Sequence, residues 1–270
     1  MQNLAKKIKK YFFKIFLLLG ENRKYVRLPA VSESIVSADP GKLFVVVVAF
    51  NEPELIALHG AALKKFLRSQ YEYFVIDNSS RSDRAEAIRQ YCLANKINYV
   101  RLPANPGLDG SLSHGLALNW VYQNIIQKFK PRMFGFMDHD LYPVDEVDIV
   151  SYLNRADAWG FITTQQPFWH LGRPHLACWS GLAFYRLERF AAEQPNFLPT
   201  WGFDTVGGVR VEINRTSQLP DPNIYTYVPL EIAPGVFVRQ KGKFVHFVGA
   251  SYNPHSLEDQ KRWMENILKK

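Results

Sequence analysis

The 270-residue chain carries 47% hydrophobic and 14% aromatic residues, which excludes an intrinsically disordered protein and suffices for the core of one large domain or two small ones. Its two cysteines, Cys92 and Cys178, form no C-x-x-C pair, so we expect neither a disulfide framework nor a zinc site, and a cytoplasmic location is the default. Of the formal net charge of +8, residues 1–28 contribute +7, with eight basic residues against Glu21 alone. The remainder is nearly neutral. This argues against a nucleic-acid partner, because such proteins carry their basic surface on the folded domain.

Residues 1–28 are a basic amphipathic segment in which lysines surround an apolar run from Tyr11 to Leu19. The run is too short to span a bilayer, which takes about 20 apolar residues, and Lys14 interrupts it. We predict a helix that lies on an anionic membrane surface, peripheral to the inner leaflet on its cytoplasmic side. The alternative is a helix that packs on the protein's own body and keeps its lysines in water.

Residues 21–42 are mixed and polar and end in a turn sequence at 38–41, so they are predicted to form a linker. Residues 43–50 follow as an apolar, largely β-branched run, which is typical of a strand covered on both faces. Pro53 is well placed to begin a helix, and residues 55–67 have apolar side chains at helical spacing. Together these features predict a βα unit.

The same alternation continues as far as residue 140. Strands are predicted over 73–76, 97–102 and 133–137, and helices over 84–95 and 111–129. Strands that alternate with helices build a parallel sheet through right-handed crossovers. The sequence therefore predicts an α/β fold.

The strand over 133–137 runs into Asp138-His139-Asp140, and Pro143 prevents it from continuing. Such carboxyl ends of strands are where open α/β sheets bind ligands. Residues i and i+2 of an extended chain point to the same side, so Asp138 and Asp140 can offer two hard oxygen ligands to one Mg²⁺ or Mn²⁺ ion. The alternative is that the two aspartates merely end a strand and begin a turn.

Beyond residue 150 the pattern is less regular. Helices are predicted over 149–153 and 187–192 and from Asp204, a candidate N-cap, to Asn214, with strands over 160–164, 182–185 and 243–248. We interpret this half as the acceptor side of the same domain.

Polar residues follow the predicted strands over 43–50, 73–76 and 133–137 directly. In these segments the chain resembles the family-2 glycosyltransferases of the GT-A fold. The matching pieces are Val-Ala-Phe-Asn-Glu at 48–52, Val-Ile-Asp-Asn-Ser-Ser at 75–80, Asn-Pro-Gly at 105–107, Asp-His-Asp at 138–140, Trp-Ser-Gly at 179–181, Gly-Phe-Asp at 202–204 and His-x-x-Gly-x-Ser at 246–251. Within this pattern, 179–181 look like the family's small-residue turn before its acceptor segment.

The resemblance covers about residues 43–252 and implies a GT-A-type, mostly parallel sheet flanked by helices, which is Rossmann-like. It implies one domain over 43–255, preceded by the basic N-terminal helix. Residues 43–140 would form the nucleotide-sugar half of this domain and residues 141–255 the acceptor half.

The resemblance also implies a nucleotide-sugar donor, UDP-linked or carrying another nucleoside diphosphate, and a glycan or lipid-linked acceptor. The implied donor-binding residues are Phe50, Asn51, Glu52, Asp77, Asn78, Gly110, His114 and Asp138. Mn²⁺ or Mg²⁺ would be held by Asp138, Asp140 and His246. The implied acceptor-binding residues are Trp179 and Trp201, and the implied catalytic base is Asp204.

Several of these residues have plainer explanations. Asp77-Asn78 also suits a turn, His246 a core histidine bonded to backbone, and Asp204 a helix cap. The family commonly shows an acidic pair near its base, whereas Asp204 stands singly, so Asp157 and Glu212 remain alternatives for that role.

We therefore expect a metal-dependent, inverting glycosyltransferase of surface polysaccharide or glycolipid synthesis. One alternative is a sugar-nucleotide nucleotidyltransferase, although Phe50-Asn51-Glu52-Pro53 is not the glycine-rich basic loop that such enzymes usually carry. The other is a catalytically silent carbohydrate- or membrane-binding protein.

Overall fold

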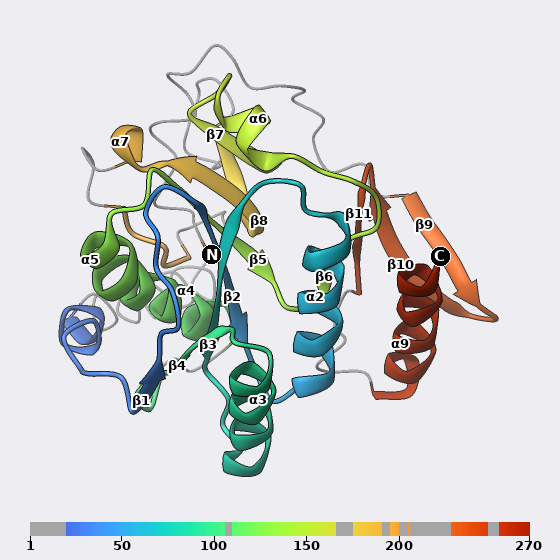
Figure 1. The fold of residues 1–270 in the computed structure, drawn as a ribbon, viewed down its shortest axis with the longest axis horizontal. Helices are drawn as coiled ribbons and strands as arrows, with labels where there is room; N and C mark the ends of the chain where they lie inside the picture. Colours follow the sequence, from blue (N-terminus) through green and yellow to red (C-terminus); the bar gives the residue numbers. More distant parts are fainter. Residues whose placement is uncertain are drawn as a thin grey trace, which may run out of the picture.

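The computed structural model describes residues 20–105, 110–165, 175–190, 195–199, 205, 228–247 and 254–270. Its main sheet has seven strands in the order β1-β4-β3-β2-β5-β8-β7 (Figure 1). These strands are β1 (Ser32–Ser34), β2 (Leu43–Ala49), β3 (Tyr71–Asp77), β4 (Asn98–Arg101), β5 (Met133–Asp138), β7 (Ala158–Gln165) and β8 (His175–Arg186). β4, β3, β2 and β5 run parallel, whereas β1, β8 and β7 pair antiparallel with their neighbours. The predicted α/β fold with a parallel, helix-flanked core is confirmed.

β2 lies inside this parallel core, and all seven of its residues are buried. Its even-numbered residues belong to an apolar cluster with α4 (Gly110–Val121), and its odd-numbered residues to one with α2 (Pro53–Phe66) and α3 (Ser82–Ala94). Fully burying a valine contributes roughly 1.5–3 kcal/mol. Burial on both faces therefore explains why this strand is an apolar run without alternation.

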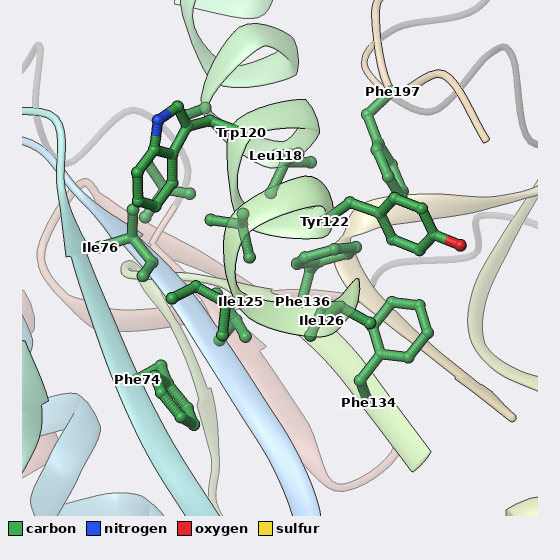
Figure 2. Close-up of a cluster of buried hydrophobic side chains, with 14 of the residues drawn as sticks. Phe74, Ile76, Leu118, Trp120, Tyr122, Ile125, Ile126, Phe134, Phe136 and Phe197 are labelled. Carbon is green, nitrogen blue, oxygen red and sulfur yellow. The ribbon is translucent and has the colours of Figure 1, made fainter. Parts of the chain in front are cut away.

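The helix predicted over 111–129 is divided into three consecutive segments. They are α4, the π-helical η1 (Tyr122–Ile126) and α5 (Gln127–Phe129). The ring of Tyr122 lies 6.1 Å from that of Phe134 on β5 and 5.9 Å from that of Phe197 (Figure 2). In the wider turn of the π-helix, Tyr122, Ile125 and Ile126 are all buried against the sheet. The apolar spacing in the sequence does not reveal this change of helical pitch.

Residues 21–42 belong to the domain, so the prediction of a linker was wrong. β1 pairs with β4, residues 20–25 are helical, and Tyr25 is buried. The indole of Trp120 donates a hydrogen bond to the carbonyl of Leu28 at 2.9 Å. The partners of this polar segment lie far along the chain, which is why its local composition resembled that of a linker.

The predicted basic helix lies largely in residues 1–19, outside the described part of the chain. Among the described residues, no helix has the length and apolar character needed to cross a membrane.

A second, antiparallel sheet has the strand order β6-β11-β10-β9. Its strands are β6 (Leu141–Pro143), β11 (Phe244–His246), β10 (Val236–Lys241) and β9 (Val228–Ala233). The apolar cluster on one of its faces draws on α2 and on α9 (Pro254–Lys269), which lie side by side in Figure 1. Two shorter helices, α6 (Ile149–Leu153) and α7 (Leu187–Phe190), complete the described elements. β11 was predicted, whereas β9, β10 and α9 were not.

His59 of α2 forms a buried polar pair between the two sheets. Its Nδ1 lies 2.8 Å from the hydroxyl of Tyr73, and the two rings stack at 5.5 Å. Burial lowers the pKa of His59 to about 3, with a further lowering from His139 that Asp140 opposes. The imidazole is therefore neutral in the folded protein at every pH above about 3.

His59 by itself is expected to reduce the stability of the folded protein by roughly 2 kcal/mol between pH 7 and pH 5. In the unfolded chain His59 takes up a proton below its ordinary pKa of about 6.5, whereas the folded state resists it down to about 3, so protonation favours unfolding as the pH falls. Urea unfolding at the two pH values measures this difference. His59→Asn keeps a polar partner for Tyr73, and it should lose roughly 2 kcal/mol less than the wild type over the same range. An equal loss in both proteins would contradict the assignment to His59.

Candidate active site

The carboxyl ends of β3, β2 and β5 lie next to one another at one edge of the main sheet. Asp77 pairs in register with Ala49, and Asp138 with Val48. Asp77 and Asp138 are therefore two strand spacings apart, about 10 Å. The predicted meeting of the strand ends is confirmed, and it brings Phe50, Asn51, Glu52, Asp77, Asn78 and Asp138 to the same edge.

Asp138, Asp140 and His246 form one cluster at this edge, with potential ligand atoms that all lie within 4.8 Å of one another. His246 joins it because β11 pairs with β6, directly after the aspartates, so that His246 is opposite Leu141. The amide of Phe247 also donates to the carbonyl of Asp140 at 2.8 Å. Strand pairing thus brings together side chains that are more than 100 residues apart.

Asp140 and His246 are an ion pair, with 3.3 Å between Oδ1 and Nε2. Burial works against charge on both groups, but each favours the charged form of the other. The pKa of the Asp140 carboxyl is held below its usual value and that of His246 above it. Asp138 adds to the negative potential that raises the pKa of His246. The cluster therefore holds concentrated negative charge beside one exchangeable proton.

This geometry fits a divalent cation. Ligands in octahedral Mg²⁺ sites bind at about 2.0–2.1 Å, which places adjacent ligand atoms about 3.0 Å apart and opposite ones about 4.2 Å apart. The 3.3 Å between Asp140 and His246 suits adjacent ligands, and the 4.8 Å within which all three potential ligand atoms lie is close to the separation of opposite ones. Carboxylates suit Mg²⁺ and Mn²⁺, and the imidazole adds a ligand that transition metals accept once the ion has displaced the proton of His246.

Two further histidines, His114 and His139, lie near the cluster. His114 projects from the first turns of α4 and places Nε2 4.0 Å from Oδ1 of Asp138. Nδ1 of His139 lies 3.1 Å from the carbonyl oxygen of Val48 on β2. The predicted contact of His114 with the donor stays a prediction, and the structure places its side chain near Asp138. Gly110 begins α4 and is exposed, and residues 106–109 before it lie outside the described part of the chain.

Asp77 is fully buried, and its carboxylate binds other groups of the protein. It accepts hydrogen bonds from the hydroxyl of Tyr99 at 2.7 Å and the amide of Ser79 at 2.9 Å, and Arg101 lies 2.9 Å away. A contact between Asp77 and a nucleotide base stays a prediction, and it would require the buried carboxylate to become accessible. Tyr99 and Arg101 were missed in the sequence because nothing nearby marks them as partners of Asp77.

Asn51 and Glu52 are held in a network that joins the ends of β2 and β3. Asn51 adopts a left-handed backbone conformation with φ 57°, and its amide donates to the hydroxyl of Ser79 at 2.8 Å. Arg84 donates to the carbonyl of Asn51 at 2.7 Å and pairs with Glu52 at 3.1 Å. Asn78 donates to the hydroxyl of Ser113 on α4 at 3.0 Å. These bonds hold the chain segments that follow β2 and β3 in place beside the aspartates.

Trp179 lies against His246, with ring centroids 5.0 Å apart, and stacks on Phe161 at 6.2 Å. The predicted small-residue turn at 179–181 was wrong, because these residues lie inside β8. There, residues 179–182 of β8 oppose Phe161 of β7, since Gly160 pairs with Ala183 and Ile162 with Cys178. Such a bulge re-aims a side chain, here toward the cluster.

Asp204 and Trp201 lie outside the described residues, as does Glu212. Thr205 is described, and its hydroxyl lies 3.4 Å from the carbonyl of Ser111, which places it beside the start of α4. The alternative base Asp157 lies near the amino end of β5, at the opposite end of the strands from the aspartates. Its carbonyl accepts a hydrogen bond from the amide of Arg186, and Arg186 is the register partner of Met133, the first residue of β5. The length of β5, about 16 Å, separates it from Asp138, so Asp157 is rejected.

A family model described as Glycosyl transferase family 2 matches residues 44–189, more than half of the chain and most of the elements that build this edge. The chain belongs to glycosyltransferase family 2. The expected family is thereby confirmed. A comparison with curated proteins finds no match.

Solved structures similar to this family-2 glycosyltransferase are themselves distant. TarS of S. aureus is 13% identical with a TM-score of 0.44, over 68% of this chain and 36% of TarS. Mannosyltransferase PcManGT from Pyrobaculum calidifontis, solved with GDP-Man and Mn²⁺, is 15% identical with a TM-score of 0.41, over 68% of this chain and 55% of that one. Mannosyltransferase Ktr4p of S. cerevisiae is 10% identical with a TM-score of 0.41, over 65% and 67%. The chain thus spans about a third to a half of the first two proteins.

Proposed function

We propose that this protein transfers a sugar from a nucleoside-diphosphate donor to a glycan or lipid-linked acceptor, with Mn²⁺ or Mg²⁺ held by Asp138, Asp140 and His246. The observation that carries the proposal is the convergence of these three side chains at the carboxyl edge of the sheet, within 4.8 Å of one another. A bound cation would neutralise the negative charge on the departing diphosphate.

The network around this cluster supports a donor site. Asn51, Glu52 and Asn78 border the edge next to the proposed metal ligands, where open α/β sheets bind nucleotides. Their hydrogen bonds to β3, α3 and α4 hold the backbone in place before a ligand arrives. Such preorganisation lowers the entropy cost of binding. Phe50 and His114 complete the proposed donor surface.

Transfer needs a base within hydrogen-bond reach of the acceptor hydroxyl. We propose Asp204, whose neighbour Thr205 lies beside α4, the helix that also carries His114. Attack from the face opposite the diphosphate would invert the anomeric configuration. Trp179 and Trp201 are the proposed acceptor contacts. The ring of Trp179 contacts His246, which would bring an acceptor sugar bound there next to the proposed metal site.

The proposed setting is surface polysaccharide or glycolipid synthesis at the inner leaflet. The seven net positive charges of residues 1–28 would attract the chain to anionic lipid, where a lipid-linked acceptor would also be found.

A thermal-shift panel of UDP, GDP, CDP, ADP and dTDP tests the donor and the metal together. With Mn²⁺, one diphosphate is expected to raise Tm by about 5–10 °C at 100 times its Kd, since this concentration adds about 2.7 kcal/mol and each kcal/mol shifts Tm by about 2–4 °C. EDTA should remove most of the shift, and the matching monophosphate should give less. The absence of a shift with every diphosphate would overturn the proposal in favour of a catalytically silent binding protein.

A further inference from the structure

Residues 28–31 present apolar side chains to solvent. Leu28 is 43% exposed and Val31 is 68% exposed, and Pro29 between them is also exposed. Apolar side chains scattered singly over a surface need no explanation, whereas neighbouring ones form a contiguous patch that suits a contact. We call Leu28, Pro29 and Val31 the apolar patch.

The backbone of the apolar patch is fixed to the body of the domain. The indole of Trp120 donates a hydrogen bond to the carbonyl of Leu28 at 2.9 Å, and the amide of Val31 donates to the carbonyl of Arg101 at 2.9 Å. Between these two points, Ala30 packs against the apolar core. Because the segment is held at both ends and in its middle, Leu28 and Val31 stay in water unless another molecule covers them.

Basic residues adjoin the apolar patch. Arg23, Lys24 and Arg27 are exposed, and Glu21, which pairs with Lys24, is the one acidic residue of the first 28. Residues 1–19 add five lysines on the N-terminal side. Cations beside exposed apolar side chains match an anionic bilayer, which presents phosphate groups above hydrocarbon.

The small size of the apolar patch favours a bilayer over a protein partner. A stable protein interface buries about 800 Å² on each partner, which three side chains cannot supply. They do suffice to anchor a chain that its charge already draws to a lipid surface. A fluid bilayer also requires no matching shape.

The apolar patch lies at the same edge of the main sheet as the candidate active site. Arg101, which holds Val31, is the register partner of Asp77 at the carboxyl end of β3. From β1 to β5 there are four strand spacings, about 19 Å in all. In Figure 1 the helical turn of residues 20–25 and β1 lie together, away from the hairpin of β9 and β10. A surface that covers the patch therefore adjoins the edge that carries the proposed metal ligands.

We propose, on the basis of the proposed function, that residues 23–31 dock on an anionic lipid surface, with Leu28 and Val31 inserted among the headgroups and Arg23 and Arg27 against the lipid phosphates. The docked protein has the carboxyl edge of its sheet beside the bilayer, so that a lipid-linked acceptor reaches the site without leaving the membrane. Attraction between charges would hold the protein near the membrane, whereas a patch with a fixed backbone also sets its orientation.

Co-sedimentation of the full chain with vesicles of phosphatidylglycerol and phosphatidylcholine in equimolar mixture tests this surface. The double variant Leu28→Ser, Val31→Ser should bind about 10- to 100-fold more weakly, the loss for two apolar side chains that are half inserted. The double variant Arg23→Gln, Arg27→Gln should bind about 30-fold more weakly. This second difference should shrink at high salt, which screens the attraction.

The double variant Val36→Ser, Leu93→Ser is the matched control. It removes one valine and one leucine that are 53% and 37% exposed, from the other end of β1 and from α3, and should bind like the wild type. Equal binding by the wild type and Leu28→Ser, Val31→Ser would overturn the inference, as would a wild type that does not bind these vesicles. Either result leaves the proposed sugar transfer standing, because the diphosphate panel tests it without lipid.

A fluorophore at residue 31 gives a measurement that a folding defect does not imitate. Cys92 and Cys178 are both buried, so the new thiol of Val31→Cys can be labelled selectively with an environment-sensitive dye. Its emission should shift to the blue on the same vesicles, whereas the emission of labelled Val36→Cys should not. The absence of a shift at residue 31, or equal shifts at both positions, would contradict docking by this patch.

Discussion

Asp140→Asn is expected to reduce sugar transfer at least about 100-fold and to remove the Mn²⁺ dependence of diphosphate binding. The carboxylate is the buried centre of the proposed metal site, 3.3 Å from His246, and its substitution removes both a ligand and a negative charge. Charge stabilisation by a catalytic metal ion is worth several kcal/mol, which corresponds to this loss in rate. Donor hydrolysis and transfer, measured over a range of Mn²⁺ concentrations, report the effect.

Asp145→Asn is the control for this substitution. Asp145 is an exposed aspartate five residues along the chain, with Lys243 at 3.8 Å as its ionic partner. The variant carries the same change of charge and should retain full activity. Asp140→Asn protein that is folded and still transfers sugar at the wild-type rate would be incompatible with a metal held by this residue.

Gly135→Ala is expected to destabilise the protein by about 3 kcal/mol or more, at the upper end of the cost of overpacking a core. A Cβ at this position of β5 would lie 2.0 Å from Cδ1 of Phe184 and 2.6 Å from the carbonyl oxygen of Ala183. Phe184 is fully buried among the side chains of an apolar cluster, so moving its ring would disturb that packing. The clash also lies three residues before Asp138, and we expect weaker Mn²⁺ binding in any protein that folds.

Thermal unfolding measures the loss as a fall in Tm of about 10 °C, at 2–4 °C for each kcal/mol. Gly20→Ala serves as its control, because no atom of the described residues lies within 4 Å of the added Cβ and the residue is in a short helix. That variant should melt like the wild type. A Gly135→Ala protein with unchanged Tm would show that β5 and β8 are less tightly packed than their register implies.

The parallel core of the fold could be predicted because its signals are local. Burial on both faces explains the apolar run of β2, and the turn residues at its end explain where it stops. The edge strand β1 could not be predicted in this way, because its short polar sequence becomes a strand only through pairing with β4. The bulge in β8 escaped prediction for a similar reason. In this bulge the indole ring of Trp179 lies against Gly181, so closely that a Cβ on residue 181 would be 2.1 Å from the ring.

The sequence by itself determined the family, the parallel core and the two aspartates at the end of β5, because each depends on residues that are neighbours in the chain. The family resemblance implied that His246 joins the two aspartates, but only the tertiary structure decided that it pairs with Asp140 at 3.3 Å. It also decided that Asp77 is fully buried and that Arg239 is the register partner of His246. These contacts depend on strand register and on burial. Both result from packing over the whole chain, where a shift of one residue would turn His246 and Arg239 to the other face.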